Sequence, residues 1–347
     1  MFFRKKKTII SIIIITLIII PVIIIYSSTK TKYGRMDFLI AGILKFVNLI
    51  DLDLQKTKHK DLRDALNNLY EIIPLPLDEV KSIENLKIPT KEGFISLRVY
   101  TPHHNQEKLP VLIYYHGGGW VLWNLNTYDG LCRSFAKLTP ALVFSVGYNL
   151  SPEYPFPTAL NESYQALEWI SNNAPTFGGD PNKIALAGDS AGANLATVVS
   201  ILARDRQGPK ICAQALFYPV TDLSNTETRS YNNFAEKHLL TKEMMKWFRS
   251  AYLPNPKDWS NPLASPLLTK NLKNLPPAFI ITNQFDPLRD EGEAYAQRLK
   301  QSGNQVTLKR YQDTIHAFMS IEILSQTNKA KKEAANFLKK YYNSKNF

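Results

Sequence analysis

Ser190 has the neighbours and the position that a nucleophilic serine needs. It is the centre of the stretch GDSAG at residues 188–192, which follows an apolar run and precedes a helix-like segment. A serine at such a strand-to-helix turn is a nucleophile elbow, in which a sharp, strained turn holds the hydroxyl above the edge of a sheet. Glycines are required there because the turn has no room for side chains beside it. The sequence therefore predicts Ser190 as a nucleophile.

Two further residues predict how Ser190 is activated. A serine hydroxyl is a weak nucleophile and needs a base whose pKa lies near neutrality, which is a property of histidine. His316 follows the strand-like residues 306–311, and Asp286 follows the strand-like residues 278–282. Asp286 would fix the tautomer of the His316 ring and stabilise the imidazolium. We predict a catalytic triad of Ser190, Asp286 and His316, in this order along the chain.

Three consecutive glycines at residues 117–119 follow His116 and a strand-like run. Attack on an ester carbonyl creates an oxyanion, which preorganised backbone N–H groups stabilise where the charge develops. We predict that Gly117 and Gly118 donate to this oxyanion and that the amide of Ala191 completes the hole. The alternative is a phosphate-binding loop, which is disfavoured because no GK[ST] follows and no GxGxxG pattern is present.

Four polar residues near these positions receive no catalytic role. We expect His116 to shape the glycine turn through a hydrogen bond rather than to abstract a proton. A buried hydrogen bond or a charge at a helix N-terminus explains Asp189, Asp290 and Glu291 equally well.

These residues lie in motifs that resemble those of the hormone-sensitive-lipase branch of the α/β-hydrolase esterases. The sequence carries HGGGW at residues 116–120, GDSAG at 188–192 and DPLRDE at 286–291. The chain order of serine, aspartate and histidine is also that of α/β-hydrolases. The resemblance covers about residues 86–345. It implies an α/β-hydrolase fold and hydrolysis of carboxylic esters with short or medium apolar acyl chains, without a cofactor or a metal.

A fourth segment also resembles that family, with two departures. YNLSPEYPFP at residues 148–157 is similar to the family's YRLAPEYPFP, but Asn149 and Ser151 replace the arginine and the alanine. These changes remove a charge near the wall of the site and alter no predicted catalytic atom.

Seven short segments predict the strands that position these residues. Several are continuous apolar runs, which suit buried strands of a mostly parallel sheet with helices on both faces. The predicted fold class is α/β and doubly wound, in which residues that follow the strands meet at one edge of the sheet. The strand-like segments are 95–100, 111–115, 142–146, 184–187, 213–217, 279–282 and 306–311.

Two regions depart from this alternation of strands and helices. Residues 38–50 and 52–69 are typical of amphipathic helices, and residues 231–253 predict a helical insert between strands. In the family that the sequence resembles, such pieces form a cap over the active site, which binds acyl chains and excludes water. Residues 38–50 could instead lie on a membrane surface, because Lys45 and Asn48 are their only strongly polar residues, but a cap is the preferred interpretation.

Residues 8–29 carry no charge and are rich in isoleucine. As a helix they would reach ~33 Å, which is comparable with the ~30 Å hydrocarbon core of a bilayer. A helix is expected there because an open strand in lipid would leave its backbone groups unpaired. The alternative is a cleaved signal peptide, but the apolar stretch exceeds the roughly 7 to 15 residues of such segments and no A-x-A site follows. We predict an uncleaved anchor.

The charges that flank this segment predict its orientation. Basic residues at 4–7 precede it, and Lys30, Lys32 and Arg35 follow it. The positive-inside bias places the N-terminus in the cytoplasm and the catalytic domain on the other side of the membrane. The predicted domains are a tail and anchor at 1–29, N-terminal cap helices at 30–85, and a catalytic domain at 86–347 with a cap insert near 224–262.

The net charge of +12 does not indicate a nucleic-acid partner, because the sequence has no recognition motif or basic, aromatic groove. Attraction to anionic lipid headgroups is compatible with this charge. Cys132 and Cys212 are far apart and lack the spacing of metal ligands, so we expect two buried thiols and no metal site.

The sequence therefore predicts a serine hydrolase that cleaves small-molecule esters. An amidase or deacetylase remains an alternative, since the same acyl-enzyme route serves both bonds and the amine leaving group only demands better protonation by His316. A non-catalytic receptor of the same fold is a further alternative, which the presence of all three triad residues disfavours.

Overall fold

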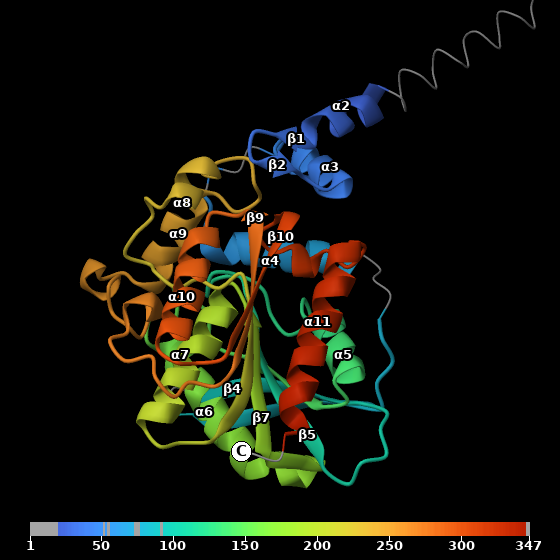
Figure 1. The fold of residues 1–347 in the computed structure, drawn as a ribbon, viewed down its shortest axis with the longest axis vertical. Coiled ribbons are helices and arrows are strands. Elements are labelled where there is room, and N and C mark those ends of the chain that lie inside the picture. The colour runs from blue at the N-terminus through green and yellow to red at the C-terminus, as the bar shows by residue number, and fades with distance from the viewer. Residues whose placement is uncertain (1–19, 51–52, 54–55, 73–76, 91–92, 345–347) are drawn as a thin grey trace, which may run out of the picture.

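An eight-stranded sheet forms the centre of the computed structural model, which describes residues 20–50, 53, 56–72, 77–90 and 93–344 (Figure 1). The strand order is β10-β9-β8-β7-β5-β6-β4-β3. The strands are β3 (Ser82–Thr90), β4 (Gly93–Thr101), β5 (Leu109–Tyr115), β6 (Leu142–Gly147), β7 (Gly179–Asp189), β8 (Ile211–Phe217), β9 (Ala278–Phe285) and β10 (Val306–Ile315).

The sheet is mostly parallel. Neighbouring strands are parallel along the part of the sheet with the order β10-β9-β8-β7-β5-β6. At the other edge, β4 runs antiparallel to β6, and β3 runs antiparallel to β4. Each of the seven predicted strands is confirmed. β3 was not predicted, because Ile88 is its only fully buried residue and an edge strand with one buried residue has a weak apolar pattern.

Helices cover both faces of the sheet, which confirms the doubly wound α/β prediction. The residues of β5 alternate between two cores: Ile113 belongs to the core that also contains residues of α6, α7 and α10, and Leu112 belongs to the core that contains residues of α5 and α11. The five helices are α5 (Asp129–Leu138), α6 (Thr158–Asn173), α7 (Ala191–Asp205), α10 (Arg289–Gln301) and α11 (Ser325–Tyr342). Short 3-10 turns are η2 (Ala174–Phe177), η3 (Pro256–Asp258), η4 (Pro266–Leu268) and η5 (Phe318–Ser320).

Helices from two distant parts of the sequence meet at the carboxyl edge of the sheet. α8 (Arg229–Asn233) and α9 (Lys242–Tyr252) lie in the connection between β8 and β9. α4 (His59–Ile72) comes from the N-terminal part, and its His59 ring stacks on Trp247 of α9 at 4.3 Å. The Arg63 side chain also donates from α4 to the backbone carbonyl of Val121, at 2.7 Å. α4 and α9 therefore lie together beside the loop that follows β5.

A small N-terminal unit lies beyond the ends of β9 and β10 (Figure 1). It consists of α2 (Ile20–Ser28), the two-stranded hairpin of β1 (Lys30–Thr31) and β2 (Gly34–Arg35), and α3 (Phe38–Val47). Most of the predicted membrane segment at 8–29 falls outside the described residues. Each helix that the structure does describe is too short or too polar to cross a bilayer.

Candidate active site

Ser190 lies at the turn between β7 and α7, in a strained backbone conformation. Its φ is 53° and its ψ is −118°, a region that residues with a side chain rarely adopt. A Cβ on Gly192 would overlap the carbonyl oxygen of Tyr115, and one on Gly188 would lie 2.5 Å from the backbone of Gly192. Both glycines are therefore required for the close approach of β5, β7 and α7, and the predicted elbow is present.

The structure brings the three predicted triad residues together. The Nε2 atom of His316 lies 2.9 Å from the Oγ atom of Ser190, and its Nδ1 atom lies 2.8 Å from Oδ2 of Asp286. Asp286 follows β9 and His316 follows β10, so neighbouring parallel strands place them side by side. All three side chains are buried, with Asp286 fully inaccessible to solvent.

The surroundings of Asp286 orient its carboxylate toward the His316 ring. Oδ1 accepts a hydrogen bond from the backbone N–H of Leu288 at 2.8 Å, and Oδ2 accepts one from the side-chain NH₂ group of Asn283 at 3.2 Å. A carboxylate beside Nδ1 selects the tautomer in which Nδ1 carries the hydrogen, which leaves Nε2 free to accept the Ser190 proton. The Tyr218 ring packs edge-on against His316, with ring centroids 4.8 Å apart.

The prediction that Gly117 donates to an oxyanion is wrong. Its N–H donates instead to the Tyr128 hydroxyl and to Oδ1 of Asp189, each at 3.0 Å, so it points into the protein. Gly118 and Gly119 follow with φ values of 102° and 62°, which turn their amides in a different direction. Within the described part of the chain, neither amide has a hydrogen-bond acceptor.

The third predicted donor, Ala191, is the first residue of α7. The N–H groups of the first helical turn have no partner within the helix and carry the positive end of its dipole. Its amide directly follows Ser190, as an oxyanion donor must. The amides of Gly118, Gly119 and Ala191 are therefore the groups available to hold a negative oxygen.

Asp189 is the residue whose importance the sequence did not reveal. Its carboxylate is buried and accepts hydrogen bonds from the hydroxyls of Tyr114 at 2.9 Å and Tyr128 at 2.8 Å, besides the Gly117 amide. Burial raises the pKa of Asp189 to about 6, although the two tyrosine hydroxyls oppose that rise. Its place directly before the nucleophile was the only available signal, because its partners lie far away in sequence.

His116 has the structural role that was predicted for it. Its Nδ1 atom lies 2.8 Å from the carbonyl oxygen of Gly117, and its ring stacks on that of Tyr148 at 4.3 Å. Burial lowers the pKa of His116 to about 4, so the ring is neutral near neutral pH. A buried, neutral ring bonded to its own loop shapes that loop and has no contact with the Ser190 hydroxyl.

Asp290 and Glu291 bind backbone groups of the segment that follows β8. Asp290 accepts from the N–H of Ser230 at 2.7 Å, and Glu291 accepts from those of Thr221 at 2.7 Å and Asp222 at 3.2 Å. Burial raises the pKa of Glu291 well above its usual range. Both side chains therefore fix α10 to this segment, as the hydrogen-bond interpretation of the sequence allowed.

The two cysteines are buried thiols without a disulfide, as predicted. Burial raises the pKa of both Cys132 and Cys212 to about 12, which makes them poor nucleophiles and poor metal ligands. In the described ranges, the histidines, cysteines and carboxylates form no group of three that is suited to a metal ion.

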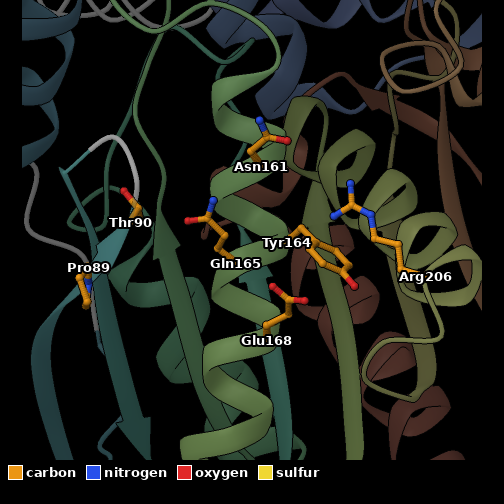
Figure 2. Close-up of a pocket in the computed structure, with 7 residues that line it drawn as sticks. All are labelled: Pro89, Thr90, Asn161, Tyr164, Gln165, Glu168 and Arg206. Carbon is orange, nitrogen blue, oxygen red and sulfur yellow. The ribbon is translucent and has the colours of Figure 1, made fainter.

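A surface hollow of about 610 Å³ lies away from these residues, on the outer side of α6 (Figure 2). Its polar lining includes an arginine above a tyrosine ring, with 4.5 Å between the guanidinium carbon and the ring centroid. No triad residue contributes to it, so it is not the acyl site. Its lining residues are Pro89, Thr90, Asn161, Tyr164, Gln165, Glu168 and Arg206.

Residues 112–320 match a protein family described as having the alpha/beta hydrolase fold. The chain is 40% identical over 265 residues to the carboxylic ester hydrolase LipN of Mycobacterium tuberculosis, an alignment that covers 75% of this chain and 70% of LipN. It is 35% identical over 269 residues to an arylesterase of Saccharolobus solfataricus, with 77% of this chain and 87% of that relative covered.

A solved structure gives the same result at the level of the fold. An esterase from the archaeon Pyrobaculum calidifontis superposes with a TM-score of 0.84 at 37% identity, covering 88% of this chain and 98% of that protein. The matched family range contains the elbow, the glycine loop and both partners of Ser190.

Proposed function

Since this chain belongs to the hormone-sensitive-lipase-like family of α/β-hydrolases and is a carboxylesterase, we propose that it cleaves esters with short or medium acyl chains through an acyl-enzyme formed on Ser190. The observation that carries this proposal is the unbroken hydrogen-bonded path from Asp286 through His316 to the Ser190 hydroxyl. Each member of that path has the chemistry that its step requires.

In the first half-reaction, Nε2 of His316 takes the hydroxyl proton of Ser190 as Oγ bonds to the ester carbonyl carbon. The carbonyl oxygen becomes an oxyanion, to which the amides of Gly118, Gly119 and Ala191 donate. Asp286 stabilises the imidazolium meanwhile. The carbon–oxygen bond to the alcohol then breaks, and His316 gives its proton to the departing alkoxide. This step leaves the acyl group on Ser190.

In the second half-reaction, a water molecule replaces the alcohol. His316 takes a proton from the water, whose oxygen bonds to the acyl carbon, and the same amides hold the second oxyanion. The bond to Ser190 breaks, and His316 returns the proton to Oγ. The carboxylic acid leaves and the free serine is restored, so the cycle needs no cofactor.

Aromatic side chains beside the glycine loop support an apolar substrate of limited size. A Cβ on Gly119 would overlap the Phe248 ring of α9, and a Cβ on Gly118 would lie 2.5 Å from the Trp123 ring. The Trp123 and Phe248 rings therefore pack against the glycine loop as apolar walls. Such walls favour apolar acyl groups and strengthen electrostatic interactions beneath them by excluding water.

The experiment is a comparison of p-nitrophenyl esters of increasing acyl length with p-nitroanilides of the same acids. We expect kcat/KM to be highest for short or medium esters and at least ~10²-fold lower for the matched anilides, because the amine leaving group is poorer. Anilide turnover that exceeds ester turnover would make the chain an amidase and contradict the proposal.

We also propose that residues 8–29 anchor the enzyme in a membrane, with the catalytic domain on the non-cytoplasmic side. The support is the uncharged, isoleucine-rich sequence and the basic residues at 4–7. In sealed vesicles whose cytoplasmic face points outward, a C-terminal tag should resist protease, and the protein should resist extraction by alkaline carbonate. Digestion of the tag or release by carbonate would contradict the orientation or the anchor, respectively.

A further inference from the structure

The N-terminal unit carries an unusual concentration of exposed apolar side chains. More than half of the large apolar residues that are exposed in the described part of the chain lie between residues 20 and 50. Phe46 is 69% exposed and Leu49 is 81% exposed. Contiguous apolar surfaces of this kind mark sites of interaction. We call this set the α2–α3 surface; it comprises Ile20, Val22, Ile23, Ile24, Tyr26, Phe38, Leu39, Phe46, Leu49 and Ile50.

The exposed face of α3 follows from how the helix is fixed to the catalytic domain. Ile40 and Leu44 are buried in the core that also contains α11. Asp37 caps α3, because one of its carboxylate oxygens accepts from the N–H groups at the start of the helix. The backbone N–H of Asp37 donates to the carbonyl of Asp313 at 2.9 Å, and the other carboxylate oxygen accepts from the Gln326 side chain at 3.1 Å. Phe38, Leu39 and Phe46 are therefore held on the outside.

The hairpin between α2 and α3 ties the same unit to the catalytic edge of the sheet. The Gln284 side chain, two residues before Asp286, donates to the carbonyl of Tyr33 at 3.0 Å. The Tyr33 hydroxyl donates to Asn233 of α8 at 2.9 Å, and its ring packs edge-on against Phe234. The α2–α3 surface thus has a fixed position at the carboxyl ends of β9 and β10, where the triad lies (Figure 1).

Contact between the two helices sets the depth at which α3 would meet a bilayer. Ile25 of α2 lies against Gly42, since a Cβ on Gly42 would be 3.7 Å from its side chain. Ile25 is four residues before the end of the segment 8–29 proposed as the anchor, which corresponds to ~6 Å along a helix. α3 would therefore lie at the depth where interfacial helices bury their apolar face, roughly 5–10 Å into the boundary of headgroups and acyl chains.

The charges around this surface suit anionic headgroups. Lys30, Lys32, Arg35 and Lys45 are all exposed. Asp37 is the one carboxylate in residues 20–50, and its oxygens are turned toward α3 and Gln326. Basic residues close to an anionic leaflet are attracted to it. An apolar face bordered by cations therefore favours a phospholipid bilayer as its occupant.

We propose that α3 and the end of α2 lie in the interfacial layer of a phospholipid bilayer that contains anionic lipids, while the rest of α2 belongs to the anchor in the hydrocarbon core. We propose further that this contact holds the active site toward esters dissolved in that bilayer. The proposal rests on the proposed esterase activity and anchor, and it adds a second membrane contact and a substrate class. Its consequence is that the distance from Ser190 to the lipid is set by the contacts that tie the α2–α3 surface to the catalytic domain.

The test of the contact uses the full chain in vesicles of phosphatidylcholine and phosphatidylglycerol. A fluorescent label is attached to a Phe46→Cys variant. The control is the same label on a Gln301→Cys variant, at the exposed end of α10 on the opposite edge of the sheet. The two native thiols are buried, so the label should not react with them. Nitroxide-labelled lipids should quench the label at 46 at least severalfold more than the label at 301. Equal, weak quenching would overturn the proposal.

A partner protein or a second copy would give a different result. Shielding of the label at 46 that follows protein concentration and does not need lipid would identify a second copy of this chain and would overturn the membrane assignment.

The test of the substrate class uses the double variant Phe46→Glu/Leu49→Glu and the matched control Phe94→Glu, an exposed phenylalanine on β4. Activity on soluble p-nitrophenyl butyrate should be unchanged in both. Activity on a long-chain ester dissolved in the vesicles should fall about tenfold in the double variant alone, because two apolar membrane contacts are lost. Equal activity on the dissolved ester would overturn the substrate class, whereas a wild type inactive on the soluble ester would instead refute the proposed function.

Discussion

The carboxylate of Asp189 and the backbone amide of Gly117 lie 3.0 Å apart, and their hydrogen bond joins the turn that carries Ser190 to the loop that carries the oxyanion amides. The hydroxyls of Tyr114 and Tyr128 donate to the same carboxylate. One buried side chain thus sets the distance between the nucleophile and the groups that stabilise its product. This arrangement explains why the first glycine of the loop points inward while the next two remain available.

Asp189→Asn should separate positioning from binding. Asparagine has the same size, but its NH₂ group cannot accept the hydrogen bonds that the second carboxylate oxygen accepts. We expect kcat to fall by about 10- to 100-fold with KM within about twofold of the wild type. The loss is smaller than the roughly 10²- to 10³-fold effect of removing an oxyanion donor, because the variant displaces the donors and does not remove them. Steady-state kinetics on one p-nitrophenyl ester measure both. An unchanged kcat would remove Asp189 from the account of the oxyanion loop.

The raised pKa of Asp189 also predicts how the stability of the protein depends on pH. Burial raises the pKa of Asp189 to about 6 from an ordinary value of 3.8. A raised pKa contributes stability that is present below pH 4 and is lost as the pH rises through 6. We would therefore measure the free energy of unfolding by denaturant at pH 4, 5, 6 and 7. The difference between the Asp189→Asn variant and the wild type should shift by about 3 kcal/mol in favour of the variant over this range. A difference that does not vary with pH would argue against a strained, ionised carboxylate.

The triad should behave as one unit. Ser190→Ala and His316→Ala are each expected to lower kcat by ~10⁴-fold or more, and the double variant should lose little beyond either single variant. The reason is that neither residue transfers a proton without the other. Rates of ester hydrolysis measured over several hours provide the comparison. Multiplicative losses in the double variant would mean that the two side chains act independently.

The elbow glycine gives a prediction about stability with an internal control. Gly192→Ala places a Cβ into the carbonyl of Tyr115 and should lower the free energy of unfolding by about 3 kcal/mol or more, with loss of activity. Gly130→Ala is the control, because it lies within α5 and its Cβ would come no closer than 3.4 Å to a neighbour. That change should stabilise the protein by about 0.5 to 1 kcal/mol. Similar effects of both changes would contradict the steric interpretation.

The triad and most of the sheet could be predicted because their signals are local. Ser190, Asp286 and His316 each follow a strand, and parallel strands bring such residues to one edge. The direction of each glycine amide could not be predicted, since it depends on Asp189 and Tyr128, which contact Gly117 only in the folded chain. A run of glycines has no side chains that would reveal which amide turns inward.

The edge of the sheet and the N-terminal unit show the same limit of local signals. β3 pairs with β4 over nine residues, yet Ile88 is the only fully buried one, and Ile83 and Leu86 are only partly buried against the core, so its apolar pattern is weak. For residues 38–50 the apolar pattern favoured a cap only slightly over a membrane surface. Ile40 and Leu44 on one side of α3 join the hydrophobic core, whereas Phe38, Leu39 and Phe46 stay exposed. The sequence pattern alone could not tell these two sides of the helix apart.

The central claim is that Ser190 is made nucleophilic by His316 and Asp286, and labelling with a fluorophosphonate probe tests it most directly. The wild type should gain one covalent label, which peptide mass spectrometry should place on Ser190, while Ser190→Ala should gain none and His316→Ala should react at least ~10³-fold more slowly. A label on another residue, or a His316→Ala variant that reacts as fast as the wild type, would contradict the account.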